Sequence, residues 1–170
     1  VLIKTIHKLL MIEPHLKFVI SLSPQVNHKY ENQLKQIKAV TIDYTNSAWS
    51  VCLKSSIAIV ASGTATLECA ISKTPFIVIY KTSFINWLIS KSVLSIPFVS
   101  IVNILANQLV APEYLQFRAN SATLSSSIIS LLENSSKMID NLSELSNNLG
   151  DGRSYQKTAE FIVGFKSSCV

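Results

Sequence analysis

Apolar residues follow two patterns along the chain, and the two patterns alternate. Leu2, Ile6 and Leu9 stand three or four positions apart, which predicts a helix. That helix covers residues 2–12 and ends before Pro14. Short apolar runs bounded by turn residues predict buried strands, at residues 18–22, 40–42, 57–61, 76–80 and 98–101. Helical spacing between these runs predicts helices, at residues 29–37, 47–54, 64–72 and 84–93.

Beyond residue 121 the pattern is purely helical. Further helices are predicted, at residues 124–132, 138–145 and 155–165. Strands that are apolar on both faces and alternate with helices indicate a parallel sheet covered on both sides. Because crossovers between parallel strands are right-handed, we predict an α/β fold with a doubly wound, Rossmann-like parallel sheet and C-terminal helices. Residues 1–150 are expected to form this lobe, and residues 151–170 a C-terminal helix.

The composition of the 170 residues fits a folded lobe. Apolar residues make up 48% and charged residues 15%, which excludes an intrinsically disordered chain. The net charge of +5 comes almost wholly from scattered lysines, and Arg118 and Arg153 are the only arginines. A nucleic-acid interface, which clusters basic residues and uses arginine, is therefore not expected. The lysines are interpreted as solvated surface, with anionic substrates or an acidic membrane surface as alternatives.

Neither a metal site nor a membrane span is predicted. The cysteines are odd in number and far apart, which suggests buried thiols in a reducing cytoplasm: Cys52, Cys69 and Cys169. No ligand-like spacing links the histidines, His7, His15 and His28. The longest apolar stretch, residues 84–105, is broken by Lys91 and by Pro97, unlike a spanning helix. Because the chain starts at Val1 without a secretory signal, it is interpreted as a fragment whose upstream part is missing.

The most informative segment is the turn Ser62-Gly63-Thr64, which joins a predicted strand to a predicted helix. In parallel sheets, ligands bind beyond the carboxyl ends of the strands, which here are the loops after Leu22, Ile42, Ala61 and Tyr80. Gly63 allows tight backbone geometry, and the first amides of a helix carry a partial positive charge. With the hydroxyls of Thr64 and Thr66, they predict a site for a phosphate or diphosphate. The alternative is that Ser62 or Thr64 only caps the helix.

Glu68 lies one turn into the same predicted helix. A capping box does not explain it, because its acidic residue would stand three positions after Ser62 or Thr64. Its carboxylate could accept hydrogen bonds from both hydroxyls of a ribose, and an exposed surface carboxylate is the alternative. The G-x-G-x-x-G pattern is absent, which argues against NAD or FAD. The G-x-S-x-G elbow is absent too, which argues against Ser62 as a nucleophile.

The order and spacing of several segments resemble the lipid-A-disaccharide synthase family: residues 62–68, 74–81, 87–88 and 99–106. The resemblance extends from about Phe18 to Leu132. It implies the C-terminal lobe of a GT-B glycosyltransferase, in which two Rossmann-like lobes face a cleft. The family transfers acylated glucosamine from UDP-2,3-diacylglucosamine to 2,3-diacylglucosamine 1-phosphate. The products are the β-1,6-linked lipid A disaccharide, with inversion at the anomeric centre, and UDP.

The resemblance also implies where ligands and partners bind. Gly63, Thr64 and Thr66 would face the diphosphate, and Glu68 the ribose. Further residues would border the donor site: Ser62, Ser23, Tyr80, Lys81 and Asn103, the last in a loop. No cofactor or metal is implied, and the family's catalytic residues belong to the N-terminal lobe, so this chain is expected not to turn over alone. The implied location is cytoplasmic, at the inner face of the cytoplasmic membrane of Gram-negative bacteria. The implied partners are this membrane surface and the missing N-terminal lobe.

The chain departs from the family pattern beside Asn103. Val102 precedes it where the family has proline, and Asn107 and Gln108 stand where the family has Gly-Arg. An arginine charge is therefore missing. The alternatives are another GT-B enzyme, such as a MurG-like transferase or a UDP-GlcNAc epimerase, and a non-catalytic nucleotide-binding remnant.

Overall fold

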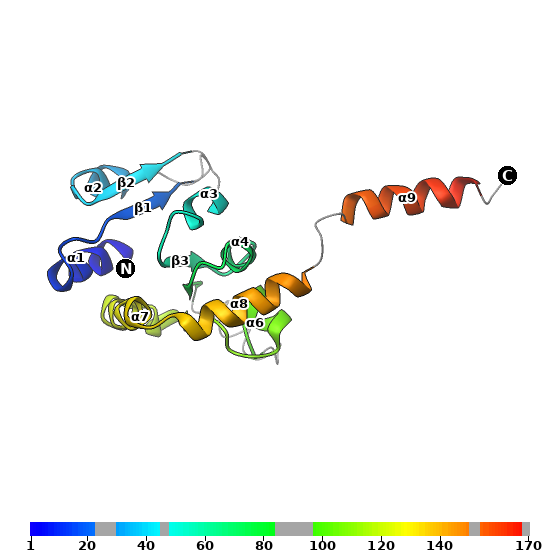
Figure 1. Cartoon of the computed structure of the whole chain (residues 1–170). Coiled ribbons are helices and arrows are strands. Elements are labelled where there is room, and N and C mark those ends of the chain that lie inside the picture. Colours follow the sequence, from blue (N-terminus) through cyan, green and yellow to red (C-terminus); the bar gives the residue numbers. More distant parts are fainter. Residues whose placement is uncertain (23–29, 45–47, 84–96, 150–153, 168–170) are drawn as a thin grey trace.

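The structure, a computed structural model, describes residues 1–22, 30–44, 48–83, 97–149 and 154–167. Its elements alternate between helices and strands over the first two thirds of the chain and are helical after that (Figure 1). In chain order they are α1 (Leu2–Ile12), β1 (Phe18–Ser21), α2 (Glu31–Lys35), β2 (Val40–Asp43), α3 (Ala48–Cys52), β3 (Ala58–Ala61), α4 (Ala65–Ile71), β4 (Phe76–Tyr80), α6 (Ile101–Ala106), β5 (Glu113–Leu115), the 3-10 helix η2 (Gln116–Arg118), α7 (Ser121–Glu133), α8 (Ser136–Asn148) and α9 (Ser154–Ser167).

The described strands all pair in parallel. Hydrogen bonds join β1 to β2, where Phe18 lies opposite Val40, and they join β3, β4 and β5 in that order. In the second sheet Ala61 lies opposite Ile79, and Tyr80 lies opposite Leu115. The prediction of an α/β fold with parallel strands is confirmed, and the hydrogen bonds divide the strands between two sheets.

The central strand β4 is buried on both of its faces. Phe76 and Val78 pack into one apolar cluster with residues of α3, α4, α6 and α8. Ile77 points the other way, into a second cluster with Leu9 of α1 and Leu124 of α7. Helices α1 and α7 lie side by side (Figure 1). Because each such buried side chain contributes roughly 1.5–3 kcal/mol, the two clusters fix β4 and therefore the point at which it ends.

One predicted strand is wrong, and one strand was missed. Residues 97–100 form no strand, and residue 101 begins α6 instead. A short apolar run such as residues 98–101 fits a strand and a helix start equally well, so its spacing could not decide. The missed strand is β5, which spans only three residues and is too short to show alternation. The helix predicted at residues 84–93 lies outside the described residues.

Helix α9 lies apart from the other elements in Figure 1. The buried residues of the described chain all lie between Thr5 and Leu145, so α9 adds none of them. Among the described helices, none combines the length and the apolar character that crossing a bilayer would need.

Candidate functional site

The turn between β3 and α4 lies where β3 leaves the sheet. The amide of Ser62 donates to the carbonyl of Ile79 at 3.3 Å, so the turn starts against β4. Gly63 has φ of +149°, a conformation that side-chain-bearing residues rarely adopt. Apart from the neighbours of Gly63 in the chain, no described residue has a heavy atom within 4 Å of the position that a Cβ on Gly63 would take. Glycine is therefore required by the backbone conformation and not by crowding, and the space beside the turn is open.

Free amides follow Ser62 along the turn. No backbone or side-chain acceptor among the described residues takes the N–H groups of Gly63, Thr64 or Ala65. Thr64 is exposed and is the N-cap of α4, although its side chain makes no capping bond. The turn therefore offers unpaired donors at the positive end of a short helix, as an anion site requires.

Two of the hydroxyls at this turn are already engaged by the protein. The side chain of Thr66 is fully buried, and its hydroxyl donates to the carbonyl of Gly63 at 2.8 Å. The hydroxyl of Ser62 donates to the carbonyl of Val99 at 2.5 Å. Both bonds hold the turn itself, so Thr66 and Ser62 shape the site, and Thr64 is left as its exposed hydroxyl.

Glu68 lies in the first turn of α4 and is half-buried. Its carboxylate makes no ion pair or hydrogen bond with any described residue. Its oxygens are not among the buried atoms without a partner in the described part of the chain, so water or a ligand can reach them. Its place beside the turn is therefore compatible with binding a hydroxylated ligand.

The strands of the second sheet end together, and we call this edge the carboxyl edge: Ser62, Gly63, Thr64, Tyr80, Lys81 and Gln116. Tyr80 is 41% exposed at the end of β4, and the exposed Lys81 follows it. Because β3 and β4 are parallel and in register, the structure brings both residues to the edge that carries the turn. Ser23, also predicted at the donor site, lies outside the described residues.

Asn103 does not lie in a loop, so that prediction is wrong. It belongs to α6 and is fully buried. Its side-chain amide donates to the carbonyl of Ala111 and to a carboxylate oxygen of Glu113, each at 2.8 Å. Its side-chain oxygen accepts from the amides of Val110 and Ala111, each at 2.9 Å. All four hydrogen-bonding positions of the amide are used, and Asn103 holds the segment that leads into β5.

Two polar residues, Glu113 in β5 and Gln116 directly after it, were not predicted from the sequence, because the strand itself was not predicted. Glu113 accepts from the amides of Val99 and Ser100 at the start of α6. Gln116 follows β5 with φ of +47° and accepts from the amide of Thr82 at 3.4 Å. In the sequence, the one sign of this strand is the pair Pro112-Glu113, which follows a short apolar segment.

The structure brings together two cysteines that are 17 positions apart. The sulfur atoms of Cys52 and Cys69 lie 3.3 Å apart, and both thiols are free and buried. Their hydrogen bond lowers the pKa of Cys52, and the same bond together with burial raises the pKa of Cys69. The prediction of buried free thiols is confirmed for this pair, which packs α3 against α4.

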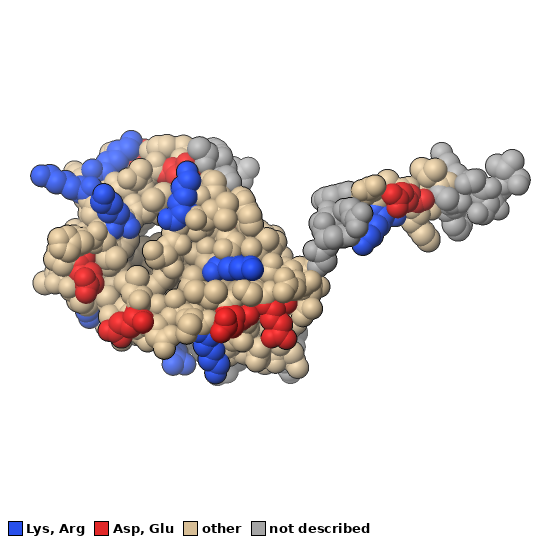
Figure 2. All heavy atoms as spheres, in the orientation of Figure 1, with Lys and Arg blue, Asp and Glu red and all other residues tan. Residues whose placement is uncertain are grey.

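Hollows and charges elsewhere do not point to a second site. A hollow of about 360 Å³ lies between α1 and α7, and none of its lining residues belongs to the carboxyl edge. On the face in Figure 2, basic side chains are spread over several elements and interspersed with acidic ones. Within the described ranges, no group of three or more His, Cys, Asp or Glu could hold a metal ion.

Comparison with known proteins gives one consistent family. The family model described as lipid-A-disaccharide synthetase matches residues 1–161. Lipid-A-disaccharide synthase 1 of Legionella pneumophila strain Lens is 29% identical over 167 residues, which cover 96% of this chain and 44% of that protein. The lipid-A-disaccharide synthase of Aquifex aeolicus is 30% identical over 130 residues, 76% of this chain and 32% of that protein. The chain thus spans less than half the length of these curated relatives.

Proposed function

The chain belongs to the lipid-A-disaccharide synthetase family, and we propose that it is the lobe that binds the UDP-activated acylglucosamine. The resemblance found in the sequence is confirmed by the family match over residues 1–161. The observation that carries the proposal is the turn at Gly63, whose free amides stand at the carboxyl edge of a parallel sheet.

In this proposal the diphosphate binds at the turn. The amides of Gly63, Thr64 and Ala65 and the hydroxyl of Thr64 would donate to its oxygens. Lys81 would add a positive charge from the next strand along the edge. The departing UDP gains negative charge in the transition state, and fixed donors that face it need no reorganisation at that moment. A lobe of this kind stabilises the leaving group through its own amides.

Glu68 would read the ribose of the same nucleotide. Glu68 is half-buried, and its carboxylate makes no hydrogen bond or ion pair with a described residue, so it would accept hydrogen bonds from two ribose hydroxyls. Ser62 and Thr66 enter the proposal as residues that hold the turn through Val99 and Gly63, and not as ligands. Asn103 is left out of the site because its amide is fully used inside the protein.

The remaining steps of the reaction belong to a second lobe. We propose that this lobe binds the acylglucosamine 1-phosphate acceptor and supplies the residues that activate it, with inversion at the donor's anomeric carbon. Helix α9 would pack on that lobe, which is supported by its position apart from the described core (Figure 1) and by Ile162, which is 57% exposed. Both acylated substrates favour work at the cytoplasmic membrane surface.

A non-catalytic nucleotide-binding remnant is the second candidate, and the residues after α6 favour it. Asn107 is in the left-handed conformation with φ of +49°, which asparagine tolerates nearly as well as the family's glycine. The backbone is therefore kept, but Gln108 carries no charge where the family has arginine. Turnover of the chain joined to its acceptor lobe separates the candidates, because an active enzyme would turn over with Gln108 in place, whereas a remnant would need Gln108→Arg or stay inactive.

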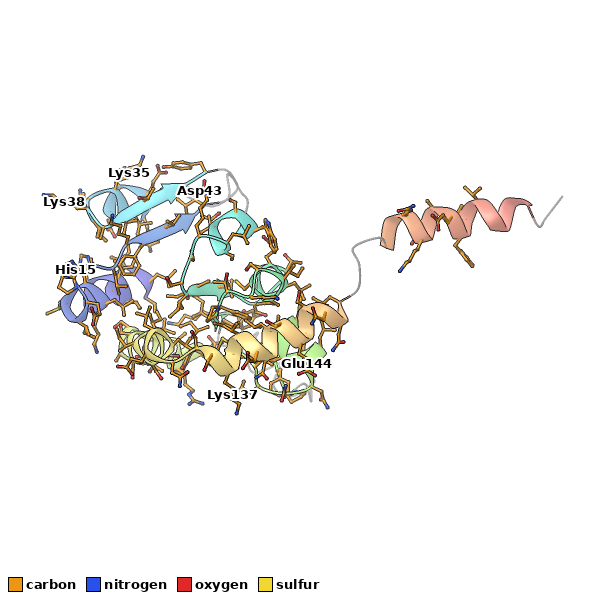
Figure 3. All side chains as sticks on the ribbon, in the orientation of Figure 1. His15, Lys35, Lys38, Asp43, Lys137 and Glu144 are labelled. Carbon is orange, nitrogen blue, oxygen red and sulfur yellow. The ribbon has the colours of Figure 1, made fainter. Side chains whose placement is uncertain are left out.

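Calorimetric titration of the chain with UDP tests the proposal. We expect saturable binding, and Glu68→Ala should weaken UDP roughly 10- to 100-fold, because it removes charge-assisted hydrogen bonds to the ribose. The same substitution should leave the affinity for inorganic phosphate unchanged. Glu144→Ala is the matched control, because Glu144 projects from α8 away from the core (Figure 3).

Two results would count against this assignment. A folded chain that shows no saturable UDP binding would remove the donor-lobe function. Equal losses of UDP and phosphate affinity in Glu68→Ala would show that Glu68 does not read the ribose.

A further inference from the structure

The carboxylate of Glu113 faces only hydrogen-bond donors among the described residues. One oxygen accepts from the amide of Ser100 and from the side chain of Asn103, each at 2.8 Å. The amide of Val99 donates to both oxygens, at 3.2 and 3.0 Å. Val99 and Ser100 come directly before α6. Glu113, a residue of β5, therefore pairs the amides at the start of a helix that precedes β5 in the sequence. The negative charge is favourable at this helix end.

Val99 also bonds, through its carbonyl, to a residue of the candidate site. Its carbonyl accepts the hydroxyl of Ser62 at 2.5 Å, and Ser62 directly precedes Gly63. Glu113 and Ser62 therefore both bond to Val99: Glu113 accepts from its N–H group, and Ser62 donates to its carbonyl. Through Val99, the carboxylate on β5 is connected to the turn between β3 and α4.

We propose that Glu113 is a positioning residue for the nucleotide-sugar site, acting through Val99 and Ser62. The carboxylate fixes Val99, Val99 fixes the hydroxyl of Ser62, and the amides of Gly63 and Thr64 are held in place before a ligand arrives. Binding then loses less freedom, because the donors are already ordered. This inference rests on the proposed UDP site.

The same arrangement also directs where an anion binds. The amides of Val99 and Ser100 donate to the carboxylate of Glu113, so they are not available to a diphosphate. The amides of Gly63 and Thr64 have no such partner among the described residues. The carboxylate therefore occupies the two amides directly before α6, whereas the turn before α4 has no such internal acceptor among the described residues.

The test is a double-mutant cycle on the whole chain, with UDP affinity measured by calorimetry. Glu113→Gln keeps the size of the side chain but turns an NH₂ group toward donors, and Ser62→Ala removes the bond to Val99. Each should weaken UDP about tenfold, roughly 1.4 kcal/mol. The double variant should lose little more than either single one, because both break the same connection. Glu144→Gln is the control and should bind UDP as the unaltered chain does.

Folding is followed separately by circular dichroism, and the outcomes are distinct. If the unaltered chain does not bind UDP, the proposed function fails. If it binds UDP but folded Glu113→Gln binds equally well, only the positioning role fails. Additive losses in the double variant also overturn it, because Glu113 and Ser62 would then act separately. Should Glu113→Gln not fold, Glu113→Asp replaces it, since the shorter side chain keeps the charge but withdraws the oxygens from Val99.

Discussion

Single residues in unusual backbone conformations lie at three connections of this fold. Lys73, Asn107 and Gln116 have φ of +56°, +49° and +47°. Lys73 and Asn107 each follow a helix, where a left-handed residue lets the last carbonyls find partners. Gln116 follows β5 at the carboxyl edge. Asparagine tolerates this conformation, whereas Lys73 and Gln116 are strained, and the surrounding contacts hold them in place.

Lys73→Gly should raise the free energy of unfolding. Glycine removes the steric cost of the left-handed conformation, which exceeds the entropy that glycine loses on folding, and we expect a gain of about 0.5–1 kcal/mol. Urea unfolding measures it. Lys73→Ala is the control, because it removes the same side chain but keeps the Cβ and should not stabilise. Equal effects of both variants would show that the side chain, and not the backbone, matters.

Specific hydrogen bonds mark where helices of this protein begin and end, and α7 is the clearest case. The side-chain oxygen of Asn120 accepts from the amides of Ala122 and Thr123, at 3.1 and 3.0 Å. Before α6, Glu113 of the strand β5 accepts from the amides of Val99 and Ser100. A local cap can be found from the sequence, whereas these bonds before α6 exist only in the folded chain.

Asn120→Ala should lower the free energy of unfolding by about 1 kcal/mol, because the first amides of α7 lose their acceptor. Thermal and urea unfolding give the value. Asn120→Asp keeps an acceptor at the same place and should cost little. If aspartate destabilises as much as alanine, the capping bond is not the cause.

At the scale of the whole molecule, the described core is complete without α9. The buried residues lie between Thr5 and Leu145, and two apolar clusters cover the two faces of β4. Helix α8 closes the first cluster with Met138, Leu142 and Leu145. Folding of the lobe is therefore expected to depend on α8 and not on α9.

A chain ended after Leu149 should unfold at the same temperature as the full chain and bind UDP equally well. It keeps every described buried residue. A chain ended after Glu133 is the control: it loses the fully buried Leu142 and should no longer unfold cooperatively. Calorimetric scanning follows both. A clear drop in the unfolding temperature of the longer variant would show that α9 packs on this lobe.

The sequence by itself determined the alternation of helices and strands up to β4, the helical character after residue 121 and the place of the turn. Helical spacing and short apolar runs are local, and Gly63 marks a backbone conformation that few other residues adopt. These features needed no knowledge of which segments pack together. The parallel arrangement followed from strands that are apolar on both faces.

The tertiary structure alone decided how the polar side chains are used. Asn103 and Glu113 bond to groups that the sequence places several residues or more away, and Ser62 reaches Val99 across 37 positions. Which backbone groups remain unpaired depends on how the strands and helices pack, and a side chain binds whichever of them lies within reach. For the same reason β5, only three residues long, is recognisable by its pairing with β4 and not by its own pattern.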